Sequence, residues 1–151
     1  MTNSDAAAAS DATNGAAEAK APVAVIAAHG DLAAGLVSAV EQITGRGALF
    51  VPLSNRDLSA GELELRIEAH LATGIQVVFT DLPAGSTTIC ARRLQRVHPD
   101  LVIVTGASLT ALLAFALAAE DGPVEAARAA VDKARSALQA VGGAPTPSTG
   151  G

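Results

Sequence analysis

The chain has 151 residues, half of them apolar, which is enough for one ordinary domain with a hydrophobic core. A formal net charge of −5 and only three aromatic residues, all Phe, argue against nucleic-acid binding, which uses basic surfaces and stacking platforms, and they predict a core of Ala, Val, Leu and Ile. The single cysteine, Cys90, has no partner for an internal disulfide, so we expect a reducing compartment, the cytoplasm.

The two ends of the chain differ in composition from its middle. Residues 1–20 are mostly Ala, Ser, Asp, Asn and Gly, and residues 142–151 are rich in Gly, Pro, Ser and Thr. Both compositions predict disorder, so we expect one domain over 21–141 between a disordered extension and a flexible tail. The acidic start and the short apolar run over 109–119, well under the roughly 20 residues of a bilayer span, predict neither a secretory signal nor a transmembrane segment.

Short apolar runs alternate with helical patterns along the middle of the chain. The run 23–28 predicts a strand buried on both faces, and apolar residues at helical spacing then predict a helix that ends at Gly45. Residues 48–51 predict a second strand, which we expect to end at Pro52. The Ser-x-x-Glu motif over 59–62 is a capping box and predicts the start of the next helix.

The second half of the domain continues this alternation. The expected features are a helix end at Gly74, a strand over 76–80, a helix over 87–97, a strand over 101–105, and helices over 109–119 and 123–141. Alternating strands and helices, with strands apolar throughout, predict an α/β fold: a three-layer, open, mainly parallel sheet of four strands with helices on both faces. Four strands are too few to close a barrel.

Two chemically capable side chains follow strands of this predicted sheet. In an open parallel sheet, ligands bind beyond the carboxyl ends of the strands. His29 follows the first strand and Asp81 follows the third. A carboxylate that accepts a hydrogen bond from one imidazole nitrogen fixes the tautomer and leaves the other nitrogen as a nucleophile or base. His29 and Asp81 are therefore the candidate catalytic residues.

The turn after Asp81 has the features of an anion site. Ala84, Gly85 and Ser86 precede or open a predicted helix, where backbone N–H groups and the positive end of the helix dipole favour an anion. Gly85 allows close approach of the backbone, and the hydroxyl of Ser86 or Thr87 can donate a further hydrogen bond. Ala84, Gly85 and Ser86 are therefore candidate phosphate-binding residues.

The same residues also have structural explanations. A histidine at a strand end is often merely exposed, an aspartate often stabilises a turn, and a serine often caps a helix. His70 lies inside a predicted helix and His98 precedes the fourth strand, so neither shares an edge with His29. Cys90 has no partner at metal-motif spacing, and we expect it in the core. The residues predict no metal site and no cofactor.

Three segments taken in order resemble a known family. These segments are the strand ending in His29-Gly30, the stretch Asp-Leu-x-x-Gly-Ser over 81–86, and Val-Ile-Val-Thr-Gly-x-x-Leu-x-x-Leu-Leu over 102–113. Together they resemble the mannose-type enzyme IIA domain of the bacterial phosphoenolpyruvate-dependent sugar phosphotransferase system. The resemblance covers about 22–140, which is nearly all of the expected domain.

The resemblance implies a function and a role for each candidate residue. His29 would accept a phosphoryl group from the phosphocarrier protein HPr and pass it to an enzyme IIB partner, as a phosphotransferase component with a phosphohistidine intermediate. Asp81 would orient the imidazole, and Ala84, Gly85 and Ser86 would bind the phosphoryl group. The resemblance also implies a homodimer in the cytoplasm that meets the membrane only through the transporter complex.

Three alternative functions stay open. The phosphoryl-donor subunit of a dihydroxyacetone kinase resembles the same family and uses a first-strand histidine, although its turn tends to place Gly-Ser sooner after the aspartate. A regulatory module of the same fold would carry the phosphate only as a signal. A hydrolase would use Ser86, His29 and Asp81, but the Gly-x-Ser-x-Gly motif of such enzymes is missing.

Overall fold

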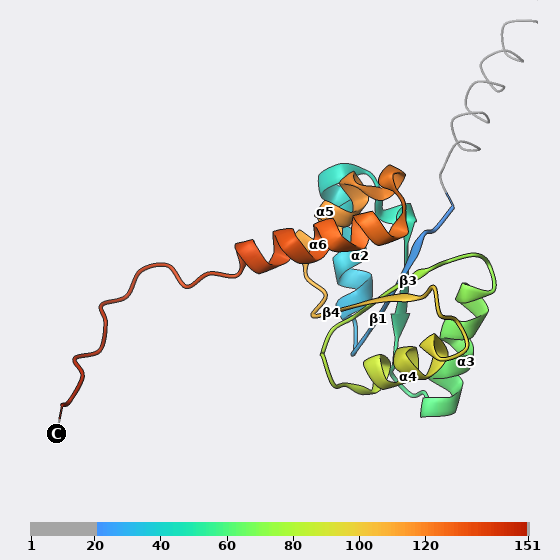
Figure 1. Ribbon diagram of the computed structural model, residues 1–151, viewed down its shortest axis with the longest axis horizontal. Coiled ribbons are helices and arrows are strands. Elements are labelled where there is room, and N and C mark those ends of the chain that lie inside the picture. Colours follow the sequence, from blue (N-terminus) through green and yellow to red (C-terminus); the bar gives the residue numbers. More distant parts are fainter. Residues whose placement is uncertain (1–20, 151) are drawn as a thin grey trace, which may run out of the picture.

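The computed structural model describes residues 21–150, so the predicted N-terminal extension lies outside the described residues. In chain order the elements are β1 (Ala24–Ala28), α2 (Leu32–Thr44), the 3-10 turn η1 (Gly47–Leu49), β2 (Phe50–Ser54), α3 (Ala60–Leu71), β3 (Val77–Thr80), α4 (Ser86–Gln95), β4 (Val102–Thr105), α5 (Leu109–Leu117), the 3-10 turn η2 (Ala119–Asp121) and α6 (Pro123–Ala137). Residues 138–150 contain no helix or strand and lead away from the body (Figure 1). Within 21–150, no helix is both long and apolar enough to cross a bilayer.

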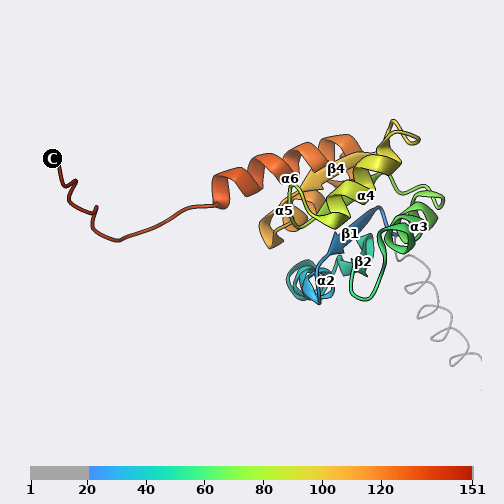
Figure 2. The ribbon, with the colours of Figure 1, turned by 90° about the horizontal axis from the view of Figure 1, so that it is seen from below.

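The four strands form one parallel sheet in the order β2-β1-β3-β4. Helices α2, α5 and α6 cover one face of the sheet, and α3 and α4 cover the other (Figures 1 and 2). The predicted three-layer α/β fold is confirmed. From β1 the chain moves outward to β2, and from β3 it moves the opposite way to β4. The connections therefore diverge between β1 and β3, where ligands of such sheets bind.

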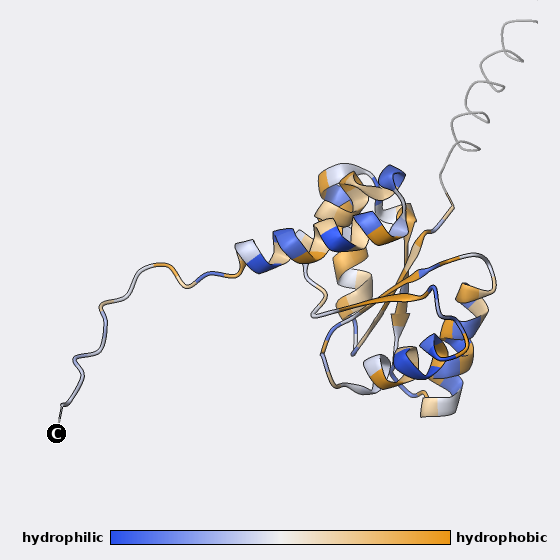
Figure 3. Cartoon of the chain, viewed as in Figure 1, coloured by the Kyte–Doolittle hydropathy of each residue, from blue (hydrophilic) through white to orange (hydrophobic). Residues whose placement is uncertain are grey.

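The central strand β1 contributes apolar side chains to the hydrophobic core on each face of the sheet. Ala24, Ile26 and Ala28 face α2, α5 and α6, whereas Val25 and Ala27 face α3 and α4. Successive side chains of a strand point to opposite faces, so a strand covered on both sides is apolar at every position. All five residues of β1 are fully buried. Figure 3 shows this as hydrophobic colour along the strands, whereas α3 and α6 have mixed colour.

The core is aliphatic except for a cluster of phenylalanines. Phe50 in β2, Phe79 in β3 and Phe115 in α5 contact one another, with ring centroids 5.2 to 6.2 Å apart. They lie in the core beneath α2, α5 and α6. The expectation of a purely aliphatic core was therefore wrong at this point. Three residues that look scattered in the sequence form one packed cluster.

Two predicted boundaries were also wrong. The second strand does not end at Pro52, because β2 is an edge strand, where a residue without an N–H group is tolerated. The last helix ends at Ala137 rather than near residue 141. Leu138 is extended and 90% exposed, so the residues beyond Ala137 have no apolar face to pack against the core.

Candidate functional site

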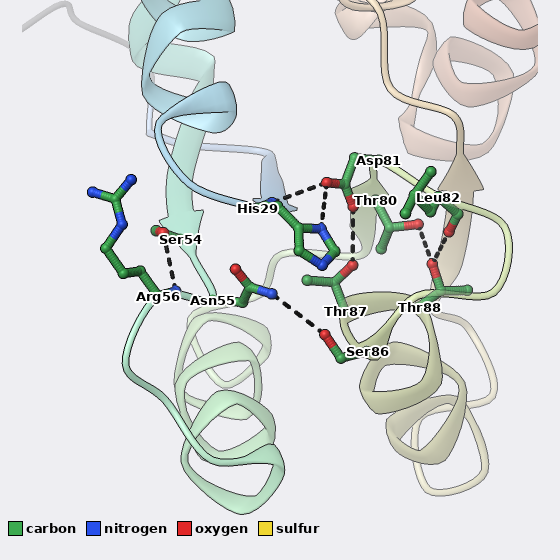
Figure 4. A network of polar contacts seen from close by, with 10 residues as sticks. All are labelled: His29, Ser54, Asn55, Arg56, Thr80, Asp81, Leu82, Ser86, Thr87 and Thr88. Carbon is green, nitrogen blue, oxygen red and sulfur yellow. Dashed lines mark hydrogen bonds and ion pairs between the residues drawn. The ribbon is translucent and has the colours of Figure 1, made fainter.

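The structure brings His29 and Asp81 together at the carboxyl edge of the sheet. β1 and β3 are neighbours with Ala27 opposite Thr80, so the residues that follow these strands emerge side by side. The Asp81 Oδ2 atom lies 2.7 Å from His29 Nδ1 and also accepts the backbone N–H of His29 at 2.9 Å (Figure 4). One carboxylate oxygen therefore holds both the ring and the backbone of His29.

This pairing leaves one imidazole nitrogen open. The Asp81 carboxylate only accepts hydrogen bonds, so Nδ1 of the neutral ring carries the proton and Nε2 carries the lone pair. The His29 side chain is 50% exposed, whereas that of Asp81 is 9% exposed. The geometry thus combines an accessible nucleophilic atom with a buried partner that fixes its orientation.

The electrostatics of Asp81 favour its ionised form. Partial burial by itself raises the pKa of this carboxyl, but the hydrogen bonds from the backbone and ring of His29 outweigh burial and hold the pKa below its usual range. The fully buried Thr87 donates its hydroxyl to Asp81 Oδ1 at 3.3 Å. The sequence suggested the Thr87 hydroxyl as a hydrogen-bond donor to the phosphate. In the structure it donates to the aspartate instead.

Gly85 brings the turn after β3 close to the imidazole. A Cβ atom built on Gly85 would lie 3.5 Å from His29 Cε1, the ring carbon next to Nε2, and 3.4 Å from the Cβ of Leu82. The absence of a side chain leaves that space beside the ring free. The exposed Ala84 precedes this glycine in the turn. The backbone of the turn therefore passes beside the nucleophilic edge of His29.

Helix α4 starts at this turn without a side-chain cap. Gly85 is its N-cap residue and Ser86 is its first helical residue, so Ser86 does not take the capping role that a serine often has there. In contrast, the hydroxyls of Ser59 and Ser108 cap α3 and α5. Because the first N–H groups of a helix lack intrahelical partners, an uncapped start is suited to an anion.

Two buried threonines attach this turn to the sheet. Thr88 shares a hydrogen bond of 2.6 Å with Thr80 at the end of β3 and donates to the carbonyl of Leu82. Thr80 is fully buried and Thr88 is 1% exposed. Sequence reasoning did not identify this pair. The signal was present, because a polar residue ending an otherwise apolar strand needs a buried partner.

Asn55 is a second residue that sequence reasoning did not single out. It follows β2, and its side-chain Nδ2 lies 3.4 Å from Ser86 Oγ, to which it donates. In residues 21–150, no hydrogen bond joins Ser86 to the His29 ring. This arrangement does not support Ser86 as the nucleophile of a hydrolase. The site therefore gathers side chains from the ends of β1, β2 and β3.

The remaining candidate residues lie apart from this site. His98 binds Glu68 through Nε2 at 2.8 Å, and His70 belongs to α3. Cys90 is in the core, as predicted, at 1% exposure. Burial, together with the negative charge of Glu64, raises the pKa of the Cys90 thiol despite the opposing effect of Arg93. His70, near the end of α3, and His98, before β4, therefore lie toward the opposite edge of the sheet from His29.

This fold is that of a phosphotransferase-system component. The model of the family described as the PTS system fructose IIA component, EIIA-man, matches residues 23–144. The match spans most of the chain, so the protein belongs to this family of IIA components. This confirms the resemblance seen in the sequence.

Solved structures share this fold. A phosphotransferase system component EIIA from Streptococcus agalactiae has a TM-score of 0.69 at 18% identity, over 78% of this chain and 95% of that one. A putative sugar phosphotransferase system permease from Klebsiella pneumoniae has a TM-score of 0.66 at 25% identity, over 82% and 93%. The mannose/sorbose-specific IIA subunit from Enterococcus faecalis has a TM-score of 0.63 at 21% identity, over 84% and 99%. The search of curated proteins returned no match.

Proposed function

We propose that this IIA component is a phosphoryl carrier that accepts a phosphoryl group from HPr on Nε2 of His29 and passes it to an enzyme IIB partner. The observation that carries the proposal is the exposed imidazole held by Asp81 beside the uncapped start of α4. Family membership supports the sugar phosphotransferase system as its setting. We further propose a cytoplasmic homodimer that meets the membrane only through the transporter.

In the transfer step the protein mainly positions the reacting groups and stabilises their charge. The lone pair of Nε2 forms a bond to phosphorus as the P–N bond of the donor phosphohistidine breaks, and the bonding electron pair returns to the donor imidazole. The His29 ring then carries more positive charge, which the Asp81 carboxylate at Nδ1 offsets. Transfer to enzyme IIB follows the same path, with its acceptor side chain as the attacking group.

The phosphoryl group itself needs hydrogen-bond donors that bind it weakly enough for release. We assign this role to the backbone at Ala84 and Gly85, the first N–H groups of α4 and the Ser86 hydroxyl. Such donors stabilise charge that develops during transfer, and they act without a metal clamp. A carrier of this kind can release the group to the next protein.

Phosphorylation of variants tests the proposal directly. The protein is incubated with phosphoenolpyruvate, enzyme I and HPr, and its intact mass is measured at neutral or alkaline pH because phosphohistidine is acid-labile. We expect the wild type to gain one phosphoryl group and His29→Ala to gain none. His70→Ala and His98→Ala are matched controls and should be labelled like the wild type. Equal labelling of His29→Ala would refute the proposal.

The acceptor is tested separately. Purified phosphorylated protein is mixed with enzyme IIB, and the mass of both partners is followed. We expect the phosphoryl group to leave the carrier and appear on enzyme IIB. Transfer only to a dihydroxyacetone kinase would assign the protein to that alternative. Retention of the group in the presence of either acceptor would favour the regulatory module.

A further inference from the structure

We propose that Asn55 is a phosphoryl-binding residue of this site, whose carboxamide orients the Ser86 hydroxyl and donates to the phosphoryl group on His29. This inference rests on the proposed function and adds a residue from the β2 end of the sheet to it. The turn after β3 and the start of α4 lie on one side of the imidazole. Asn55 adds a hydrogen-bond donor from the end of β2, the strand on the other side of β1 from β3.

The backbone places Asn55 beside His29. Ser54, the last residue of β2, pairs with Ala28, the residue before His29. The backbone N–H of Asn55 donates to the carbonyl of Ala28 at 3.1 Å. Because the sheet hydrogen bonding continues to Asn55, the residue has a defined position at the carboxyl edge. Its side chain, which is partly buried, is therefore directed by the strand rather than by a free loop.

The Asn55 side chain reaches toward the start of α4. Its Nδ2 atom lies 3.4 Å from Ser86 Oγ, which connects residues 31 positions apart in the chain. Figure 4 shows the Asn55 carboxamide and the Ser86 hydroxyl on the side of the imidazole away from the Nδ1 atom that meets Asp81. The unpaired nitrogen of the ring is on this side, so a phosphoryl group on Nε2 would lie on the side of the ring where these two side chains meet.

The hydrogen-bonding capacities of the two side chains suit an anion. A carboxamide nitrogen carries two N–H donors, and only one of them is needed for Ser86 Oγ. A hydroxyl has one proton and two lone pairs, so a serine that accepts from Asn55 keeps its own proton for another acceptor. Asn55 therefore supplies one donor itself and makes the Ser86 hydroxyl available as a second.

The neighbouring Arg56 does not take this role. Its Nη1 atom pairs with Asp31 Oδ1 at 3.1 Å, and Figure 4 shows the guanidinium pointing away from the imidazole. Although arginine is the stronger anion ligand, its side chain is engaged on the outer side of the loop. Of these two neighbours, Asn55 is therefore the one whose side chain faces the site (Figure 4).

Two substitutions of Asn55 distinguish the effect of its hydrogen-bond donors from the effect of its side-chain shape. Asn55→Ala removes the carboxamide, whereas Asn55→Asp keeps the shape but replaces the donors by a carboxylate that attracts the Ser86 proton and repels the phosphoryl group. A hydrogen bond to a charged group stabilises that group enough to change a rate by about one to two powers of ten. We therefore expect the rate of phosphoryl uptake from HPr to fall about ten-fold in Asn55→Ala and about a hundred-fold in Asn55→Asp. The KM for phosphorylated HPr should change little, because Asn55 acts on the transferred group.

The control is Ser54→Ala, which changes the adjacent residue, whose hydroxyl only accepts the backbone N–H of Arg56. This variant should take up the phosphoryl group at the wild-type rate. Wild-type rates in both Asn55 variants, or a milder loss in Asn55→Asp than in Asn55→Ala, would overturn the inference alone, since a purely spatial role tolerates the isosteric change. A wild type that is not labelled, or label kept by His29→Ala, would remove the proposed function and this inference together.

Discussion

The His29–Asp81 pair divides two requirements between two side chains. A phosphoryl acceptor has to be reached by partner proteins, and its orientation has to be fixed. The imidazole is half exposed, while the aspartate is nearly buried and receives hydrogen bonds on both carboxylate oxygens, from His29 and from Thr87. Hydrogen bonds to the charged form stabilise it and lower its pKa. Asp81 is therefore a rigid, ionised partner for a reachable ring.

This lowered pKa predicts how stability depends on pH. Since the pKa of Asp81 is lower in the folded than in the unfolded state, its contribution is complete above the unfolded pKa of about 4 and is lost as the pH falls through the folded pKa. We expect Asp81→Asn to lower the free energy of unfolding by about 1.5–3 kcal/mol at neutral pH, the contribution of a hydrogen bond to a charged group. The difference from the wild type should shrink as the pH falls below about 4 and Asp81 becomes protonated in the folded state.

Urea unfolding of both proteins across this pH range measures that difference. Other carboxylates titrate in the same range, but they do so in both proteins, so only the difference reports on Asp81. A difference that stays constant or grows as the solution is acidified would show that the Asp81 carboxylate is not stabilised by its partners.

Helices α3 and α5 start with a side-chain cap, whereas α2, α4 and α6 do not. In α3, Ser59 Oγ accepts the backbone N–H of Glu62, and Glu62 accepts the backbone N–H of Ser59 at 2.7 Å, as the sequence motif predicts. That backbone hydrogen bond lowers the pKa of Glu62. Helix α4, at the candidate site, begins with Gly85 and no side-chain cap. A cap there would occupy the amides that an anion needs.

The capping box predicts a measurable loss of stability. Ser59→Ala leaves an N–H group at the start of α3 without its acceptor, so we expect the free energy of unfolding to fall by about 1 kcal/mol. Ser136→Ala is the matched control, because Ser136 lies near the end of α6 and its hydroxyl only donates to the carbonyl of Lys133. Chemical unfolding should show little change there. Equal losses in both variants would contradict a specific role for the cap.

The phenylalanine cluster of the core involves strands that also carry the candidate site. Phe50 and Phe79 come from β2 and β3, on either side of β1, and Phe115 of α5 packs against both. The cluster therefore spans the same three strands whose carboxyl ends carry the candidate site. Packing of α5 onto Phe50 and Phe79 therefore joins β2 and β3 across the central strand β1.

Removal of one ring from this cluster predicts a large loss of global stability. Phe115 is 1% exposed, so Phe115→Ala leaves a cavity, and we expect the free energy of unfolding to fall by about 3–5 kcal/mol. Leu117→Ala is the control on the same helix, because Leu117 is 71% exposed, and it should change stability by about 0.5 kcal/mol or less. Denaturant midpoints measure both. Similar losses in the two variants would refute the packing role of the cluster.

Much of the fold could be predicted, because the forces that specify its elements act between near neighbours. The fully apolar β1 indicated a strand covered on both faces, and the Ser59–Glu62 motif indicated the start of α3. Pro52 misled the prediction of β2, since its effect depends on whether the strand lies at an edge. The roles of Thr87 and Asn55 could not be predicted, because their partners come from the ends of other strands.

By itself the sequence determined the alternation of strands and helices, and it marked His29 and Asp81 as residues at one edge of a parallel sheet. Hydrophobic periodicity and turn chemistry are local, so they can be seen without coordinates. Only the tertiary structure decided that Asp81 holds His29 across 52 positions and that Asn55 reaches Ser86. Such contacts depend on strand order and register, which follow from the packing of the whole chain rather than from any short segment.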